Sequence, residues 1–132
     1  MAATPPRSWL PQRGLGELLA TRFDLSTIRS SLGPKRSAAA NTFAALGLRA
    51  SSVSDTGVIF DDAQWHLSMT VLRRGDFNTD GIEDLEVCFV DRAAPAYATY
   101  NAQKALLVTR YAPDGNLVAL AYTMDGCESF AR

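Results

Sequence analysis

Residues 65–90 read WHLSMTVLRRGDFNTDGIEDLEVCFV, two alternating runs joined by a polar connection. The first run has an apolar residue at every second position: Trp65, Leu67, Met69 and Val71. The second run continues this pattern: Leu85, Val87 and Phe89. Because successive side chains of a β-strand point to opposite faces, each run predicts a strand with one face on a core. The stretch therefore predicts two neighbouring strands of an antiparallel sheet.

Three further segments extend this sheet. ALLVTRY (105–111) and NLVALAYTM (116–124) are strand-like, and the sequence Pro113-Asp114-Gly115 between them is typical of a tight turn. The segment GVIF (57–60) precedes the first alternating run, and we expect it to form an edge strand. Together these segments predict an antiparallel meander.

The sequence before residue 50 has helical rather than alternating periodicity. The first segment has leucines at helical spacing: Leu15, Leu18 and Leu19. Asp24 is placed to cap a second helix, which Gly33-Pro34 ends, and a third is expected over residues 37–47. The sequence therefore predicts an α+β fold, with short N-terminal helices packed on a single antiparallel sheet.

Length and composition are those of one folded domain. The chain has 132 residues, of which 47% are hydrophobic and 20% charged. No apolar run reaches the roughly 18 residues of a membrane-spanning helix. We predict a single domain over residues 13–132. Residues 1–12 are Pro-rich and lack the apolar stretch of a signal peptide, so we interpret them as a flexible tether, left after removal of a signal sequence or lipid anchor.

The net charge of −1 is unevenly distributed along the chain. Up to Ser54 there are seven basic and two acidic residues, whereas from Asp55 onward there are six basic and twelve acidic ones. The basic residues are scattered and have no interleaved aromatic residues, which favours attraction between the two halves over a nucleic-acid surface. We predict no nucleic-acid partner.

The connection between the two alternating runs carries oxygen-bearing side chains at close spacing: Asp76, Asn78, Asp80 and Asp84. Crowded carboxylates repel one another unless a cation lies among them, and Ca²⁺ takes hard oxygen ligands. Gly81 permits the sharp turn that a calcium loop needs, and Ile82 offers a backbone carbonyl. The sequence therefore predicts a Ca²⁺ site. The alternative is a metal-free turn rich in Asp, Asn and Gly.

The spacing D-x-N-x-D-G-x-x-D resembles the calcium loop of FG-GAP repeats, the blade motif of integrin-type β-propellers. The resemblance covers residues 64–90 and implies the same ligands between two antiparallel strands. An EF-hand is excluded, because it requires a bidentate Glu where Val87 stands. A closed propeller is excluded as well, since a single motif in 132 residues cannot form several four-stranded blades.

The whole chain is similar, more loosely, to small exported bacterial proteins with one FG-GAP-like unit. Some of these are immunity proteins, which block an antibacterial enzyme delivered by the secretion system of a neighbouring bacterium. The similarity implies a periplasmic or otherwise exported binding protein that inhibits a toxin enzyme by occluding its active site. The alternatives are a calcium-dependent adhesion or envelope-structural module, and a small hydrolase.

The two cysteines, Cys88 and Cys127, allow either one disulfide in an oxidising compartment or two buried thiols. Cys88 falls on the strand face opposite Val87, and Cys127 lies in a tail that can fold back towards it. The spacing of the cysteines does not choose between these alternatives.

The sequence contains no familiar catalytic motif. His66 is the only histidine and falls in mid-strand, which is an unlikely place for a Ser/His/Asp or Cys/His arrangement. Glu83 and Glu86 flank the metal loop, and we expect both carboxylates to be solvated. Arg74-Gly75-Asp76 spells an integrin-recognition tripeptide, but Asp76 is assigned to the metal. We therefore predict that the protein is not an enzyme.

Two stretches are candidates for a partner-binding surface. The connection of residues 91–104 carries Tyr97 and Tyr100, aromatic residues of the kind that anchor interfaces. The alternative is that both tyrosines cover the edge of the sheet. Asp61 and Asp62 form a second candidate, an acidic turn suited to a cationic cleft.

Overall fold

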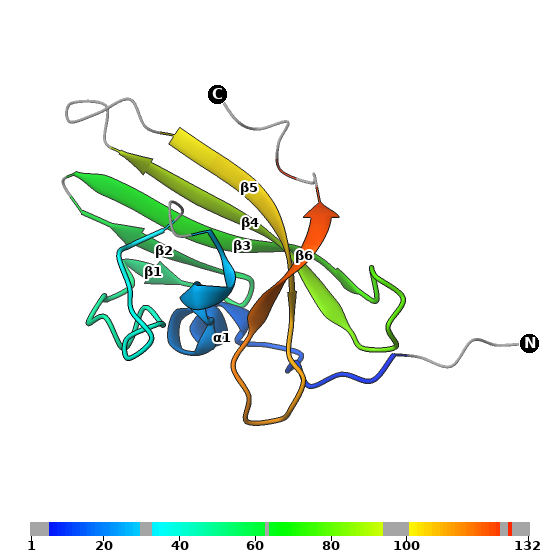
Figure 1. Ribbon diagram of the computed structural model, residues 1–132. Helices are drawn as coiled ribbons and strands as arrows, with labels where there is room; N and C mark the ends of the chain where they lie inside the picture. Colours follow the sequence, from blue (N-terminus) through cyan, green and yellow to red (C-terminus); the bar gives the residue numbers. More distant parts are fainter. Residues whose placement is uncertain (1–5, 30–32, 63, 94–100, 125–126, 128–132) are drawn as a thin grey trace, which may run out of the picture.

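The computed structural model describes residues 6–29, 33–62, 64–93, 101–124 and Cys127. Figure 1 shows the elements, which are α1 (Leu15–Arg22), the 3-10 turn η1 (Leu25–Thr27), β1 (Ser52–Val53), β2 (Gly57–Asp61), β3 (Trp65–Gly75), β4 (Asp84–Ala93), β5 (Asn101–Thr109) and β6 (Val118–Met124). The fold is mostly β, and α1 is the one α-helix of the described residues. None of their helices is long and apolar enough to cross a membrane.

The six strands form one antiparallel meander in the order β1-β2-β3-β4-β5-β6. β3 pairs with β4 along nearly the whole length of both strands, with a bulge between Val71 and Arg73. The predicted meander is confirmed. The strand predicted over residues 57–60 is confirmed as β2, but its predicted position at the edge of the sheet is wrong, because β1 pairs with β2 through Val53 and Val58.

The prediction of three N-terminal helices is wrong for two of them. α1 forms, but the segment after Asp24 makes only the η1 turn, and residues 37–47 form bends and turns. Side chains in this region bond to nearby backbone. Oδ1 of Asp24 accepts a hydrogen bond from the Ser26 amide at 2.9 Å, and Oγ1 of Thr42 accepts one from the Ala45 amide at 3.0 Å. Both are bonds of the N-cap type, which begin a helical turn but do not extend it. Helical spacing and a capping residue therefore overestimated the helix content, and the fold predicted as α+β is mostly β with one short helix.

The main core lies on the face of the sheet that α1 covers (Figure 1). Its largest buried apolar side chains come from the N-terminal segments and from alternate positions of the central strands: Leu19, Phe23, Leu25, Phe43, Met69, Leu85, Val87 and Phe89. The rings of Phe43 and Phe60 stack with their centroids 4.4 Å apart, so the turns of residues 37–47 are held on the sheet by apolar contact.

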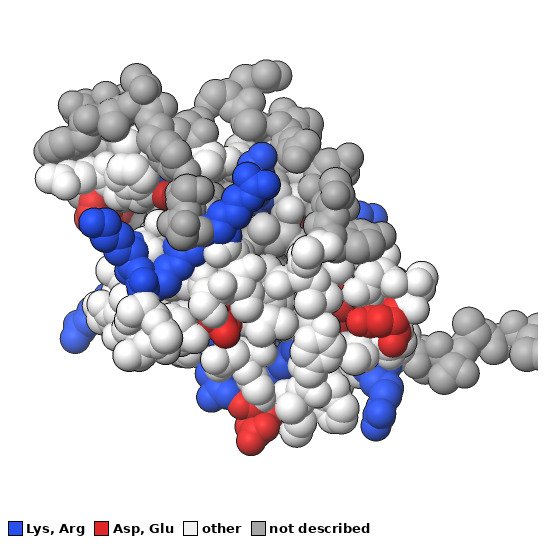
Figure 2. Space-filling view, in the orientation of Figure 1, with Lys and Arg blue, Asp and Glu red and all other residues white. Residues whose placement is uncertain are grey.

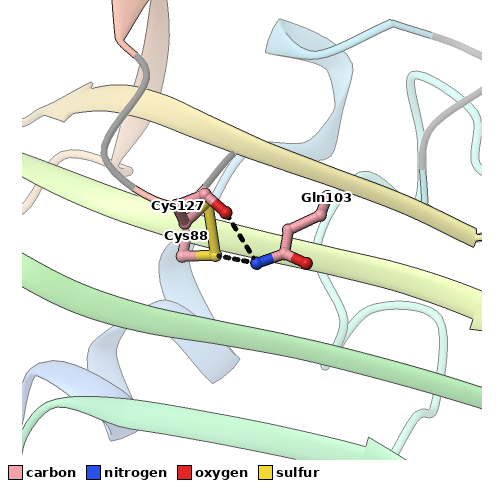
Figure 3. The surroundings of a disulfide bond; sticks show 3 residues. All are labelled: Cys88, Gln103 and Cys127. Carbon is pink, nitrogen blue, oxygen red and sulfur yellow. Dashed lines mark hydrogen bonds between the residues drawn. A yellow bond between two sulfur atoms is a disulfide. The ribbon is translucent and has the colours of Figure 1, made fainter. Parts of the chain in front are cut away.

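The opposite face of β4 is also buried, which corrects the prediction that Glu86 is solvated. Glu86 is only 2% exposed, and its Oε1 accepts a hydrogen bond from Nε of Arg73 at 2.6 Å. Two positions further along β4, Cys88 forms a disulfide with Cys127, the two Cα atoms lying 5.7 Å apart (Figure 3). Nε2 of Gln103 donates to the carbonyl oxygen of Cys127 at 2.8 Å. The disulfide therefore holds Cys127 against this face.

Candidate metal centre

The acidic loop connects β3 to β4, between Gly75 and Asp84. In a meander, alternate connections lie at the same end of the sheet, so this loop shares its end with the connection between β5 and β6. Figure 2 shows acidic side chains grouped where Figure 1 places the loop. The sheet thus presents these carboxylates together at one end.

Asp76 folds the loop back on itself. Its Oδ1 accepts a hydrogen bond from the amide of Asp80 at 3.1 Å, and its Oδ2 accepts one from the amide of Gly81 at 2.8 Å. The turn requires left-handed backbone at two positions, Thr79 with φ 59° and Gly81 with φ 84°. Glycine adopts this conformation without strain, whereas threonine does so at a cost of about 1–2 kcal/mol. The loop therefore keeps its carboxylates close at some cost in backbone energy.

The carboxylates converge on one point. One oxygen from each of Asp76, Asp80 and Asp84 lies within 4.8 Å of the other two. Asp84 is fully buried, and its Oδ2 accepts a hydrogen bond from the Phe77 amide at 3.2 Å. Oδ1 of Asp84 and Oδ1 of Asn78 are buried and have no hydrogen-bond partner in the described part of the protein. A buried oxygen without a hydrogen-bond partner lowers the stability of the folded state by about 1–3 kcal/mol. A hydrogen-bond donor or a cation beside these two atoms would remove this cost.

The surroundings of Asp84 oppose its negative charge. Burial raises the pKa of the Asp84 carboxyl, and the nearby carboxylates of Asp80 and Asp76 raise it further, while the Thr109 hydroxyl and the Phe77 amide act in the opposite direction. The phenol of Tyr111 also has a raised pKa, from burial and from Asp80 and Asp84. A cation among the carboxylates relieves this repulsion.

The backbone of Ile82 faces into the loop. Arg7 pairs with Ile82 in a parallel β-bridge, in which the Arg7 amide donates to the Gly81 carbonyl at 2.9 Å and the Glu83 amide donates to the Arg7 carbonyl at 2.7 Å. In such a bridge the amide and carbonyl of the central residue point away from the paired strand. The Ile82 amide accordingly donates to Oδ1 of Asp80 at 3.0 Å. By the same geometry its carbonyl points away from Arg7, which makes it a candidate metal ligand.

Comparison with known proteins adds no family to this description. No family model, no curated protein and no solved structure matches the chain. The function is therefore argued from the loop and its surroundings.

Of the two candidate partner surfaces, only the second has its candidate residues in the part of the chain that the structure describes. Tyr97 and Tyr100 lie outside the described residues. Asp61 and Asp62 lie at the opposite end of β3 from the metal loop and support the β2–β3 turn. Oδ1 of Asp61 lies 2.5 Å from Nδ1 of His66, and Oδ1 of Asp62 accepts the amides of Gln64 and Trp65 at 2.7 and 2.8 Å. Both acidic residues thus have local partners, while remaining exposed.

The contacts that surround the loop were not predicted. Glu83, predicted to be solvated, accepts hydrogen bonds from Nε and a terminal nitrogen of Arg74 at 3.1 and 2.8 Å, and from Oγ of Ser8 at 2.6 Å. The Arg74 hydrogen bond is the main cause that lowers the pKa of Glu83. Residues 7–11, predicted as part of a tether, contact the domain: Leu10 is 6% exposed, and the Arg7 backbone bonds to Gly81 and Glu83. Pairings across more than seventy positions leave no periodic signal.

Proposed function

We propose that the β3–β4 loop binds Ca²⁺ through side-chain oxygens of Asp76, Asn78, Asp80 and Asp84 and through the Ile82 carbonyl. The observation that carries this proposal is the pair of buried, unpartnered oxygens, Oδ1 of Asp84 and Oδ1 of Asn78, beside two further carboxylates. Both atoms are acceptors and match what a cation requires.

The chemistry of these ligands favours Ca²⁺ over other divalent ions. The proposed ligands are all carboxylate, amide or carbonyl oxygens, which suit hard cations. Ca²⁺ takes about six to eight oxygens in flexible geometry, whereas Mg²⁺ keeps several waters and rarely occupies an all-protein cage. Five protein ligands from one short loop leave room for water on Ca²⁺. The ion has a structural role, because it lies where the central hairpin closes.

We further propose that the protein is an exported binding protein without enzymatic activity. The Cys88–Cys127 disulfide supports an oxidising compartment such as the periplasm. The loose similarity of the whole chain to small exported bacterial proteins with one FG-GAP-like unit, some of which are immunity proteins, supports a secreted antibacterial enzyme as the partner. In this proposal Tyr97 and Tyr100, which follow β4 in the chain, bind the target. The predicted connection of residues 91–104 is shorter than expected, because β4 extends to Ala93 and β5 begins at Asn101, at the end of the sheet opposite the β3–β4 loop.

A calcium titration of the full chain tests the metal site. Amide chemical shifts of the loop should move with a Kd on the order of 10⁻⁴ to 10⁻³ M, the range of extracellular calcium modules. Asp80→Asn, which removes one charge but keeps an oxygen, should weaken binding by about tenfold or more. Glu17→Gln, an exposed charge removal on α1, is the control and should bind as the wild type does. A wild type that shows no saturable shift overturns the calcium site.

Co-purification from the native organism tests the partner. Bound proteins identified by mass spectrometry should include a secreted enzyme. That enzyme should be inactive in the purified complex. Tyr97→Ala and Tyr100→Ala should each weaken the complex by about thirtyfold if they are interface anchors, with Lys104→Ala as the control. Capture of a glycan or envelope protein in place of an enzyme would favour the adhesion module.

A further inference from the structure

We propose that the segment of residues 7–11, called the arm below, is coupled to the metal loop: Ca²⁺ holds it docked, and metal loss releases it. This inference rests on the proposed calcium site and adds a conformational response to it. Binding or loss of Ca²⁺ at the loop would thereby change which residues are exposed at this end of the sheet.

The backbone of the arm is hydrogen-bonded to the loop on both sides of Ile82, a proposed ligand. Its two hydrogen bonds, from the Arg7 amide to Gly81 and from the Glu83 amide to Arg7, bracket Ile82. The bridge turns the Ile82 carbonyl to the metal side. Docking of the arm and presentation of this carbonyl therefore require the same backbone conformation at residues 81–83.

Side chains next to the loop complete the contact. Glu83 accepts hydrogen bonds from Oγ of Ser8 and from the guanidinium of Arg74. The same guanidinium donates to the carbonyl of Pro11 at 2.9 Å. On the other side, Arg110 donates to the carbonyl of Trp9 at 3.2 Å. Glu83 is the last loop residue before β4, which begins at Asp84, so movement of the loop up to this strand displaces the residue that holds the arm.

Loss of the metal destabilises the conformation of the loop. Without a cation, the carboxylates of Asp76, Asp80 and Asp84 repel one another, and left-handed backbone at Thr79 is no longer offset by ligation. A shift of Gly81 and Glu83 removes the partners of the Arg7 backbone. Release of the arm exposes Leu10 and an unpaired backbone edge at residues 81–83, a place where an extended peptide can add. By linkage, an arm that Ca²⁺ holds also strengthens Ca²⁺ binding by the same factor.

Hydrogen exchange on the full-length protein tests this coupling without any substitution. In Ca²⁺, the amides of Arg7 and Glu83 should be protected. In chelator, both should exchange about tenfold faster or more, while the amides of β4 and β5 stay protected. Equal protection of Arg7 and Glu83 in both conditions, in a protein that the titration shows to bind Ca²⁺, overturns the coupling and leaves the calcium site intact. Absence of Ca²⁺ binding by the wild type instead overturns the proposed function.

A matched pair of variants tests the reciprocal effect. Arg7→Pro removes the amide that donates to Gly81, whereas Arg7→Ala keeps this amide and removes only the side chain, which lies over the Trp9 ring. Arg7→Pro should weaken Ca²⁺ binding by about fivefold relative to Arg7→Ala, the effect of one backbone hydrogen bond. Both variants should unfold at the same temperature in chelator, where the arm is released. Equal Ca²⁺ affinity of the two variants contradicts the coupling.

Discussion

Glu86 is almost fully buried on β4 and receives a hydrogen bond from Arg73, whose own side chain is 63% exposed. The pair therefore joins a buried carboxylate to the surface. The guanidinium of Arg73 also lies over the Phe77 ring, 4.9 Å from its centroid. Arg73 thus links the buried face of β4 to the first residues of the metal loop.

Arg73→Ala should destabilise the protein by about 1–2 kcal/mol, because Glu86 keeps its buried carboxylate and loses its hydrogen bond. Urea denaturation measures the loss. Arg92→Ala removes an exposed arginine from β4, the strand that carries Glu86, and should cost less than about 0.5 kcal/mol. Adding Glu86→Gln to Arg73→Ala should recover part of the stability. Equal effects of Arg73→Ala and Arg92→Ala would show that the pair contributes nothing.

Calcium should raise the melting temperature of the wild type. At about 100 times its dissociation constant, a ligand that binds only the folded state stabilises it by about 2.7 kcal/mol. Thermal denaturation followed by circular dichroism, in excess Ca²⁺ and in chelator, measures the difference. Asp80→Asn should show a smaller rise than the wild type, and Glu17→Gln the full rise. A wild type with the same melting curve in both conditions would contradict stabilisation by the metal.

The cluster of carboxylates was predictable because it is local in the sequence. Asp76, Asp80 and Asp84 lie in one short loop, so their spacing alone brings their oxygens together. The same holds for the meander, whose strands follow one another along the chain. Alternating apolar residues and short turns are sufficient to specify such neighbours.

The other features depend on contacts between distant parts of the chain. Alternation in β4 predicted a solvated Glu86, but Arg73 and the covering of this face make a buried carboxylate possible. Arg7 pairs with Ile82 and so adds an extended segment to the loop. The sequence around Arg7 has no alternating apolar pattern that would predict this pairing. In residues 37–47, apolar spacing predicted a helix, but these residues form turns that the contact between Phe43 and Phe60 holds on the sheet.

Loss of the Cys88–Cys127 disulfide should lower the free energy of unfolding by about 3–4 kcal/mol, since the bridge closes a long loop in the unfolded chain. The sequence separation is 39 residues. Urea denaturation of Cys88→Ala/Cys127→Ala measures this loss, and the reduced wild type should behave similarly. Mass spectrometry of unreduced protein after alkylation provides the direct check. Two modified thiols in the wild type would contradict the disulfide.

Acid should weaken the attachment of α1 at Asp55. Hydrogen bonds from Arg13 and from the Gly14 amide lower the pKa of the Asp55 carboxyl. A folded-state pKa below the unfolded one adds stability above the unfolded pKa of about 3.9, and this stability is lost as the pH falls through the folded pKa. Asp55→Asn should therefore reduce stability at pH 7 and flatten its fall below about pH 4. Unfolding curves of both proteins that stay parallel from neutral to acid pH would contradict this role.

Gly16→Ala should destabilise the protein by about 1–3 kcal/mol, the range for overpacking a core. A Cβ at this position would lie 2.1 Å from the carbonyl oxygen of Gly57 and 2.2 Å from that of Ser54. Both atoms belong to backbone, so the helix itself must move away from β2. Glu17→Ala, one position along α1 and exposed, isolates the effect of helix propensity and should leave stability nearly unchanged. Because alanine favours helices more than glycine does, a stabilised Gly16→Ala would show that α1 and β2 do not approach this closely in solution.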